Sequence, residues 1–553
     1  MNYLFINRAL LLLLLSCVSG PAQSSLPSLR MTASNGVSTV FWPLTAYSDI
    51  LQTATTLSPT TYWTNLATGD LVVAINTYNF FGGTVLSTTS IVGNEIALAL
   101  PATNRQQFFR LSSPRALVPC SFAIFYNGLL EFSQTATMVI NGRVHANGPI
   151  YVGTTASLTF NAPVTTTADL SAPLVDGIPS GWTPGNPSTW NVDFYGTPGY
   201  ITNTTGLGIS SLNQTNYHLL IDMPPAGEDP VSGPLRLYYE AYLVLFVTND
   251  ISGSGNPTVQ FIIQNSVNGQ WPGADPSKVI FIYTNAYAAL LKTNLPFLSL
   301  TNLFYDQRER KTNLITQIDV GYLAAWLSTN ATVQAKLPSS SSLYPTILYV
   351  ADRRKVSPTQ LAVVRLQNAA QLPANNNMGF TVATMNPLYV QGNYNVQISG
   401  SSANASAGTS NTTNTVPAAL LSDSLTVLSA HWTDASSYTT YFQQSAFNAV
   451  DDTINAVIMT GTVASTGTGS TNFSGGLHNL PRLLENWSSA NLWLNTSIIR
   501  LWDSQWATNQ FRNPLGFSPP PVNPYYNPPT RHFSFDPNLL NNAKIPPGIP
   551  LFD

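Results

Sequence analysis

The chain has 553 residues, of which 8% are charged and 44% hydrophobic, and its formal net charge is −3. Ordinary soluble domains carry about 25% charged residues, so the polar surface here must come from Ser, Thr, Asn and Gln. This composition excludes charge-driven disorder, and the sequence has no sustained basic stripe to bind nucleic acid. Abundant Thr, Val, Tyr, Phe and Ile, broken at short intervals by Asn, Gly and Pro, predict a mainly β fold.

Residues 1–24 are typical of a secretory leader, with Arg8 before an apolar run that is too short for a confident membrane span. Two endings fit the sequence. Ala22-Gln23-Ser24 offers a small-x-small cleavage site, whereas Leu14-Leu15-Ser16-Cys17 resembles a bacterial lipobox that would leave Cys17 lipidated. No other stretch is apolar enough to span a bilayer. The sequence therefore predicts export to the extracellular or outer-membrane surface of a Gram-negative bacterium, without an integral span.

Residues 31–114 contain short strand-like runs separated by turn residues, a pattern that predicts a small β-sandwich. The phrases ILQTATTLSPTTYWTNL (50–66) and NRQQFFRLSSP (104–114) resemble a small β-sandwich module, of the type that ends in FFRL, found in exported proteins of environmental bacteria. The resemblance implies an appended module without chemistry of its own. Cys120, the one cysteine outside the leader, lies in the apolar phrase VPCSFAIFY, so we expect it to be buried and unpaired.

A 20-residue repeat begins in the stretch 119–170, where TMVINGRV (137–144) aligns with SLTFNAPV (157–164). Twenty residues are too few for a propeller blade and match one coil of a β-solenoid of the right-handed β-helix type. Asn141 would then stack on Asn161 at a turn. The alternative is a pair of ordinary hairpins whose sequences are similar by chance.

The rest of the chain is predicted in three parts. Residues 171–380 form a mixed α/β insertion with strands and a helix near 312–336, where Ile315, Ile318, Tyr322 and Trp326 have helical spacing. Residues 381–510 form further solenoid rungs. Residues 511–553 are so rich in proline that we expect a C-terminal cap that wraps the surface.

A second resemblance covers most of residues 119–553. The stretch CSFAIFYNGLLEFSQTATMVINGRVHANGPIYVG and the later phrases NLFYDQRERKTNLITQIDVGYLAAW, NPLYVQGNYN, GGLHNLPRLLENW and YNPPTRHFSFD resemble exported bacterial proteins that carry PilX-type pilus-assembly descriptions. The resemblance implies an association with a pilus, and none of these phrases is a catalytic motif.

No catalytic residue, metal ligand or cofactor site is predicted, because the sequence lacks H-E-x-x-H, Cys/His zinc patterns, G-x-S-x-G, a P-loop and G-x-G-x-x-G. Polysaccharide cleavage would need carboxylates facing a groove. The acids considered for that role are Glu131, Asp423, Asp434, Asp451 and Asp452. In a strand, the side chains of the adjacent Asp451 and Asp452 would point to opposite sides.

Three other groups of residues have two interpretations each, and His145 has one. The trio His478, Arg482 and Glu485 fits either a polar site or structural pairing on a short helix, and His145 is expected at an exposed turn. The clusters 306–311 and 352–355 fit either a basic docking patch or a solvated loop with internal ion pairs. Eight tryptophans could present flat faces to sugar rings or belong to the core: Trp182, Trp190, Trp271, Trp432, Trp487, Trp493, Trp502 and Trp506.

The sequence as a whole predicts a non-enzymatic, exported cell-surface protein with a structural or adhesive role, associated with a pilus or a matrix. Its partner would be a surface protein or a polysaccharide, and its oligomeric state stays open. The first alternative is a polysaccharide-binding module. The second is a polysaccharide-degrading enzyme that uses carboxylates on a solenoid face.

Overall fold

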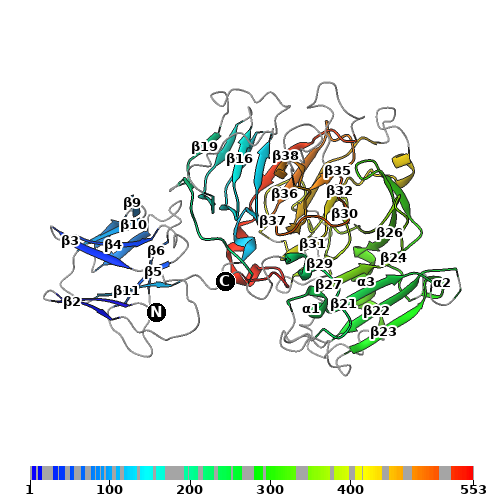
Figure 1. The fold of residues 1–553 in the computed structure, drawn as a ribbon, viewed down its shortest axis with the longest axis horizontal. Helices are drawn as coiled ribbons and strands as arrows, with labels where there is room; N and C mark the ends of the chain where they lie inside the picture. The colour runs from blue at the N-terminus through cyan, green and yellow to red at the C-terminus, as the bar shows by residue number, and fades with distance from the viewer. Residues whose placement is uncertain are drawn as a thin grey trace. The chain divides into compact units, whose positions relative to one another are not determined.

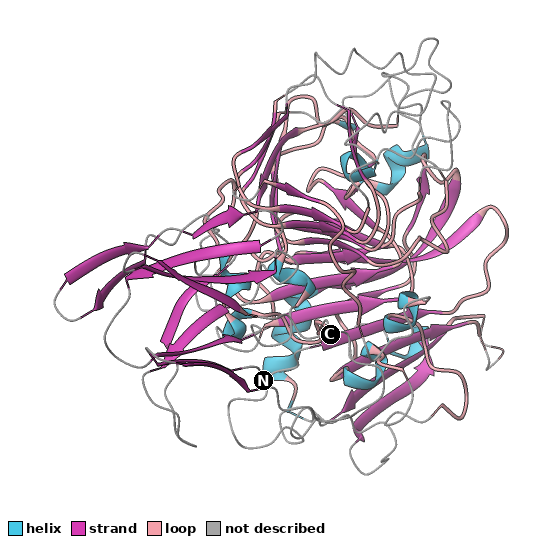
Figure 2. Cartoon of the chain, turned by 60° about the vertical axis from the view of Figure 1, so that its left-hand side comes forward, coloured by secondary structure: helices cyan, strands magenta, loops and turns pink. Residues whose placement is uncertain are grey.

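The fold is taken from a computed structural model of the whole chain (Figures 1 and 2). The structure describes residues 3–7, 10–14, 29–34, 37–43, 50–54, 64–68, 76–80, 83–87, 89–92, 95–101, 107–112, 118–133, 137–153, 157–168, 192–196, 199–209, 216–228, 234–250, 253, 255–264, 279–290, 294–331, 347–373, 379–397, 405–413, 415–438, 447–464, 476–509 and 525–551. These residues are mainly in β-strands, as Figure 2 shows, which confirms the predicted fold class at that level. They divide into two compact units.

The first unit comprises Met1–Leu117, Phe160–Thr165 and Phe194–Thr205. Its two larger sheets are antiparallel, in the orders β2-β1-β11-β5-β6 and β3-β4-β10-β9, and β7 and β8 form a hairpin. The strands are β1 (Tyr3–Asn7), β2 (Leu10–Leu14), β3 (Arg30–Ser34), β4 (Val37–Pro43), β5 (Ile50–Ala54), β6 (Thr64–Thr68), β7 (Asn76–Phe80), β8 (Gly83–Ser87), β9 (Thr89–Val92), β10 (Glu95–Pro101) and β11 (Gln107–Ser112). The stretch predicted as a leader thus supplies β1 and β2, whereas Cys17 lies outside the described residues.

A long, mostly parallel sheet dominates the second unit, which comprises Val118–Thr159, Thr166–Asp193 and Gly206–Asp553. Its strands lie in the order β15-β12-β37-β34-β31-β29-β27-β21-β22-β23, and only the last two pairings are antiparallel. Their bounds are β15 (Val144–Ala146), β12 (Ile124–Tyr126), β37 (Ile498–Arg500), β34 (Val457–Thr460), β31 (Ala418–Ser422), β29 (Phe380–Thr384), β27 (Ile347–Asp352), β21 (Leu243–Thr248), β22 (Thr258–Gln264) and β23 (Val279–Ala286).

A second sheet runs beside it in the order β24-β26-β28-β30-β32-β35, with β25 on β26, and from β26 onward it is parallel. Its strands are β24 (Leu298–Ser299), β25 (Leu303–Asp306), β26 (Lys311–Asp319), β28 (Gln360–Gln367), β30 (Leu388–Gln391), β32 (Leu425–Leu428) and β35 (Arg482–Leu483). From β26 to β32 the chain alternates between this sheet and the long one. Each passage therefore adds one strand to each sheet.

Two smaller parallel sheets also belong to the unit: β33 (Asp452–Asn455), β36 (Asn491–Asn495) and β38 (Thr530–Ser534) in one, and β13 (Leu130–Ser133) with β16 (Ile150–Gly153) in the other. β38 also contacts β14 (Met138–Ile140). Part of the predicted cap is therefore a strand of a sheet. The other strands of the stretch 157–201 are β17 (Leu158–Phe160), β18 (Val164–Thr166), β19 (Val192–Phe194) and β20 (Tyr200–Ile201), of which β18 and β20 pair in parallel.

The two ends of this unit's sequence meet in the long sheet, where β12 pairs with β37 in parallel; we call this pairing the seam. Figure 1 shows cyan strands such as β16 in the same stack as the orange and red strands β36 and β38. The Oγ of Ser497 donates a hydrogen bond to the backbone oxygen of Phe122, a contact between residues 375 positions apart. The strands at 124–153 therefore stack on the last strands of 381–510.

The 20-residue spacing also holds between paired strands, and it begins one repeat earlier in the chain than in the sequence alignment. Ile124 is in register with Val144, and Leu130 with Ile150. Between other strands the step varies: Phe380 pairs with Ala418, 38 residues on, whereas Thr426 pairs with Arg482, 56 residues on. Loops of different length between the strands explain why no repeat is visible there in the sequence.

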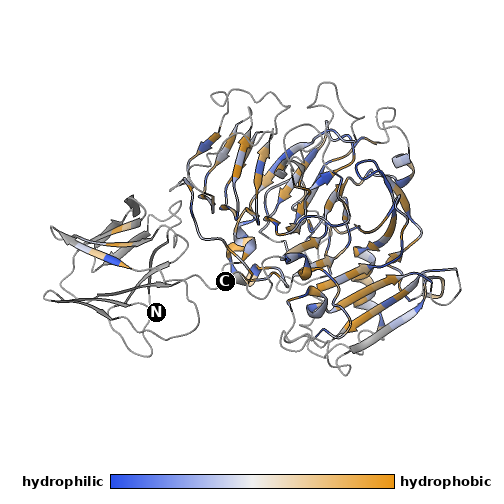
Figure 3. Ribbon diagram, viewed as in Figure 1, coloured by the Kyte–Doolittle hydropathy of each residue, from blue (hydrophilic) through white to orange (hydrophobic). Residues whose placement is uncertain are grey.

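The predicted boundary at residue 380 is not a boundary between sheets. β27 and β28, which lie in the predicted insertion, pair in parallel with β29 and β30, which lie at and beyond residue 380. Their side chains are mostly buried, and Figure 3 shows this part of the long sheet as largely hydrophobic. Such fully buried strands are continuous apolar runs without the alternation that identifies a half-exposed strand.

The helix predicted over 312–336 is correct only in its middle part. Lys311–Asp319 is the strand β26, and the helix α3 is Val320–Thr329. The Asp319 side chain caps it by accepting a hydrogen bond from Tyr322 N at 2.8 Å. Ile315 and Ile318 are therefore buried strand residues. The parallel pairing with β28 outweighs the helical spacing of these residues.

The other helices are short: α1 (Leu237–Glu240), α2 (Tyr287–Leu290) and the 3-10 helices η2 (Pro119–Ser121), η4 (Tyr217–Leu220), η6 (Asp434–Tyr438), η9 (Gly476–Asn479), η11 (Pro537–Leu540) and η12 (Asn542–Lys544). Within the described ranges, no helix has the length and hydrophobicity needed to cross a bilayer.

Candidate functional site

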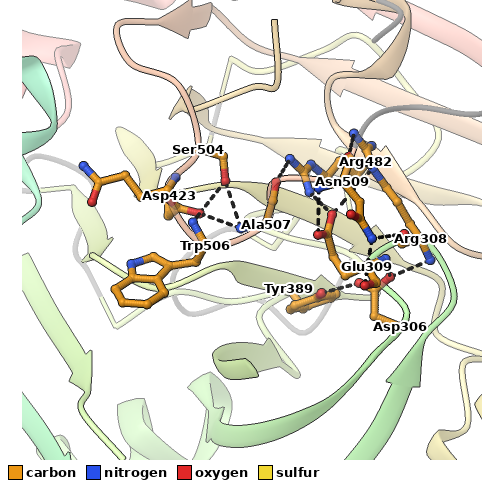
Figure 4. Close-up of polar contacts among 11 residues, drawn as sticks. Asp306, Arg308, Glu309, Tyr389, Asp423, Arg482, Ser504, Trp506, Ala507 and Asn509 are labelled. Carbon is orange, nitrogen blue, oxygen red and sulfur yellow. Dashed lines mark hydrogen bonds and ion pairs between the residues drawn. The ribbon is translucent and has the colours of Figure 1, made fainter. Parts of the chain in front are cut away.

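A buried ion-pair network holds the turn between β25 and β26 in the second unit (Figure 4). Asp306 accepts hydrogen bonds from the backbone nitrogens of Arg308 and Glu309, at 2.8 and 2.9 Å, and from the Tyr389 hydroxyl at 2.5 Å. Arg482 donates to Glu309 Oε1 at 2.8 Å. The other Glu309 oxygen accepts from Asn509 N at 3.0 Å. Each of these carboxylates is therefore held by several donors at once.

A second network surrounds Asp423, in the turn between β31 and β32 (Figure 4). This fully buried carboxylate accepts from the Ser504 hydroxyl and from Gln505 N, each at 2.5 Å. Trp506 N and Ala507 N donate to it at 3.3 and 3.4 Å. One side chain thus fixes the backbone of 504–507, just after β37.

His218 connects Asp423 to a third segment, η4. Its Nδ1 lies 2.7 Å from Asp222 Oδ1, and its Nε2 lies 3.3 Å from Asp423 Oδ1. A ring that donates to two carboxylates must carry both protons. Burial opposes the charged ring, but the hydrogen bonds and negative charges of Asp222 and Asp423 outweigh it and raise the pKa of His218 to about 9. His218 is therefore an imidazolium at neutral pH.

A pocket of about 470 Å³ opens beside this imidazolium, next to the seam. Three segments line it: Asn127, which follows β12; Asn216 to His218 of η4; and Arg500 to Gln505, at and after the end of β37. The Trp502 ring forms part of the wall and meets the His218 ring nearly edge-on, with 5.7 Å between the ring centres. The Arg500 guanidinium pairs with Asp503 and donates to the Asn127 backbone oxygen.

This arrangement is not suited to acyl transfer. A serine nucleophile needs its hydroxyl hydrogen-bonded to a base that can take the proton. Here the Ser504 hydroxyl donates to Asp423, and both His218 nitrogens are occupied by carboxylates. The imidazolium has no lone pair to accept a proton from Ser504.

The five acids considered for polysaccharide cleavage do not converge in one groove. Asp423 lies in the network described above, Glu131 is buried in β13, and Asp434 is paired with Arg365 and accepts from Trp432 Nε1. Asp451 is exposed and precedes β33, whereas Asp452, the first residue of that strand, is 1% exposed. Among the described residues, no group of three or more His, Cys, Asp or Glu side chains could hold a metal ion.

Of the trio His478, Arg482 and Glu485, the last two have separate partners, and the structure does not describe the side chain of His478. Arg482 is paired with Glu309, and Glu485 accepts from the backbone nitrogen and hydroxyl of Ser429, each at 2.6 Å. Arg482 is in the strand β35, so the predicted short helix does not extend through it.

His145 is 2% exposed, so its predicted exposure was wrong. It is a residue of β15, and its ring stacks on Phe125 of the neighbouring strand β12. Burial lowers its pKa to about 4 and an Asn147 hydrogen bond opposes this, so the ring is neutral at pH 7. Cys120 is buried and free, as predicted, and burial raises the pKa of its thiol to about 12.

The two basic clusters, 306–311 and 352–355, contain internal ion pairs, which agrees with part of the second interpretation. Their central residues are buried, however, and not solvated as that interpretation expected. Arg308 and Arg354 are 4% and 8% exposed, and Arg354 pairs with Asp352 at 2.6 Å. Of the eight tryptophans, Trp432, Trp487 and Trp502 are buried, Trp506 is 44% exposed, and Trp493 stacks on His532. Trp182, Trp190 and Trp271 lie outside the described residues.

Sequence reasoning missed the pocket because its walls come from three segments that are far apart in the chain. His218, Arg500 and Gln505 belong to no motif, and Asp423 was considered only as a catalytic acid. No family model, curated protein or solved structure matches this chain.

Proposed function

We propose that the chain is a non-enzymatic, exported structural or adhesive protein of the cell surface, associated with a pilus or a matrix. The observation that carries the proposal is the alternation of the chain between parallel, in-register sheets from β26 to β32. In this proposal the second unit is a right-handed β-solenoid, the handedness that nearly all parallel crossovers have. The two antiparallel sheets of the first unit would form a β-sandwich.

Side chains that bond from one strand to the next support a stiff scaffold. Asn495 Nδ2 donates to Asn455 Oδ1 at 2.7 Å, 40 residues earlier in the chain. At a neighbouring corner, Asn527 donates to Asn486, and Asn486 donates to Asn448. Such asparagine ladders add side-chain hydrogen bonds to those of the backbone and resist sliding of one strand over the next.

The state of the acidic groups supports a non-enzymatic role. Glycoside cleavage by the common route needs one carboxylic acid and one carboxylate about 5–10 Å apart on either side of the substrate. In the site described above, Asp423 and Glu309 are already occupied by several donors each. The predicted leader and the resemblance to PilX-type proteins support the export and the pilus association.

The test is to locate the protein in the cells that make it. Antibody detection would compare sheared surface filaments, the outer-membrane fraction and the culture medium, for the natural chain and for Cys17→Ala. Enrichment with sheared filaments is the expected result. Recovery of all the protein as free chains in the medium would contradict a surface role, and loss of membrane association in Cys17→Ala alone would identify the lipobox as the true ending.

A further inference from the structure

The geometry of the pocket beside His218 points to a ligand: we propose that it binds a neutral saccharide unit. The proposal deepens the adhesive part of the proposed function by naming a ligand class. It can be tested separately, because binding to the purified chain does not depend on where the cell places the protein.

The volume of the pocket and the hydrogen bonds that hold its walls favour a ligand-binding site. Its volume of about 470 Å³ lies within the roughly 300–1,000 Å³ typical of small-molecule pockets. Its walls are held by hydrogen bonds that are buried or partly buried: Asp423 fixes 504–507, and the Asn127 side chain donates to Leu501 O at 3.2 Å. A rigid wall reduces the entropy lost when a ligand binds.

The charges at the pocket disfavour an anionic ligand. The cations His218 and Arg500 are each paired with carboxylates, His218 with Asp222 and Asp423 and Arg500 with Asp503. With three negative charges facing two positive ones, the pocket offers no excess positive charge for a phosphate or a uronate. A strongly apolar ligand is also disfavoured, because most of the lining side chains are polar.

Donors and acceptors at the pocket mouth match sugar hydroxyls. Asn216, Asp503 and Gln505 are exposed, and the Asn216 side chain makes no capping bond to η4. Amides both donate and accept, and a carboxylate accepts from hydroxyls. Tyr217 and Trp502 also line the pocket, but they are only 4% and 5% exposed, so the polar side chains at the mouth carry the recognition. A mouth of amides and a carboxylate suits the several hydroxyls of a saccharide.

The test uses the full purified chain and a fixed panel of probes, measured by titration calorimetry and ligand-observed NMR. The panel is cellobiose, maltose, lactose, mannobiose and chitobiose, with galacturonic acid as the anionic probe. We expect millimolar or tighter binding of at least one neutral disaccharide. Asn216→Ala and Gln505→Ala should each weaken that binding about three- to tenfold, the effect of one lost hydrogen bond.

Two matched variants make the result decisive. Asp503→Asn keeps the shape of the pocket mouth and should weaken binding, whereas Lys355→Ala, exposed and four strand spacings or about 19 Å along the long sheet, should not. All four substitutions are at exposed side chains, so the fold is retained. Absence of binding by every neutral probe, binding that the three pocket variants leave unchanged, or a preference for galacturonic acid would each overturn the proposal.

Discussion

At the scale of single residues, burial of the Asp452 side chain disfavours its charged form and lowers the stability of the fold. It is 1% exposed, and neither of its oxygens has a hydrogen-bond partner among the described residues. Burial, together with the negative charges of Glu485 and Asp451, raises its pKa well above 3.8. Burial likewise raises the pKa of Glu485 to about 7, although two Ser429 hydrogen bonds oppose the shift. Burial inside the second unit therefore shifts both acids toward their protonated forms.

This gives a prediction for pH. A carboxyl whose pKa is raised on folding binds its proton more tightly in the native state, so its contribution to stability falls as the pH rises above the unfolded value. Asp452→Asn should therefore stabilise the second unit above pH 3.8, by a gain that grows by up to about 1.4 kcal/mol per pH unit. Urea unfolding at pH 4 and pH 7, followed by tryptophan fluorescence, measures this gain.

Asp451→Asn is the control, because the neighbouring Asp451 is exposed and its substitution should not add a comparable pH dependence. An Asp452→Asn chain whose stability tracks the natural chain at both pH values would contradict the buried, protonated state of Asp452.

A second prediction at this scale concerns the buried ion pair between Arg482 and Glu309. Arg482→Ala would leave Glu309 buried without its strongest partner, a loss of about 3–5 kcal/mol in the free energy of unfolding. Adding Glu309→Gln to that chain should restore part of the stability, because the unpaired charge is then gone. Arg353→Ala, at an exposed arginine, serves as the control. Equal stability of all these chains in chemical denaturation would show that the ion pair between Arg482 and Glu309 does not contribute to stability.

At the scale of elements, the turns after β12 and β15 stack with a 20-residue step. Asn147 donates to Asn127 at 3.1 Å, and a Cβ at Gly148 would lie only 2.6 Å from the backbone carbon of Gly128. Gly148 is therefore required by the close approach of two backbones. The sequence showed the Asn-Gly pairs, but it could not show which of them lie on top of each other.

Gly148→Ala should destabilise the second unit by about 1–3 kcal/mol, because the added methyl group meets backbone that cannot move aside. Gly206→Ala is the matched control: its Cβ would lie at an ordinary 3.4 Å from Asn147 Oδ1. Thermal unfolding of the two variants measures the difference, and equal melting temperatures would mean that the two turns do not pack as described.

The sequence predicted elements best where local signals and long-range pairing agree. The mainly β fold class, the 20-residue step and the burial of Cys120 could be predicted, since each follows from composition or local pattern. The strand at Lys311–Asp319 could not, because helical spacing and a largely buried strand look alike over so few residues. The pocket depends on contacts between segments that only the fold brings together.

At the scale of the whole molecule, the C-terminal segment protects a sheet edge. β38 covers β36 and contacts β14, and the Thr381 hydroxyl donates to Pro547 O at 2.6 Å. Deleting residues 525–553 would uncover β36, and exposed strand edges promote association between chains.

We therefore expect the deleted chain to melt at a lower temperature and to form oligomers that increase with concentration. Size-exclusion chromatography with light scattering detects them. A chain lacking only 551–553, which follow these contacts, should behave like the natural protein. If the chain that lacks 525–553 elutes at the size of the natural protein at every concentration, β38 does not protect the edge of β36 from association.

The pairing of β12 with β37 also determines when the second unit can finish folding during synthesis. The Ser497 hydroxyl meets the backbone of Phe122, 375 residues earlier in the chain. At about 5–20 residues per second, the ribosome needs roughly 20–75 s to make that intervening stretch. For all that time β12 can pair with β15 on one side but lacks β37 on the other. The earliest part of the second unit is thus among the last to be completed, and it must be kept from pairing with other chains until the final strands have emerged.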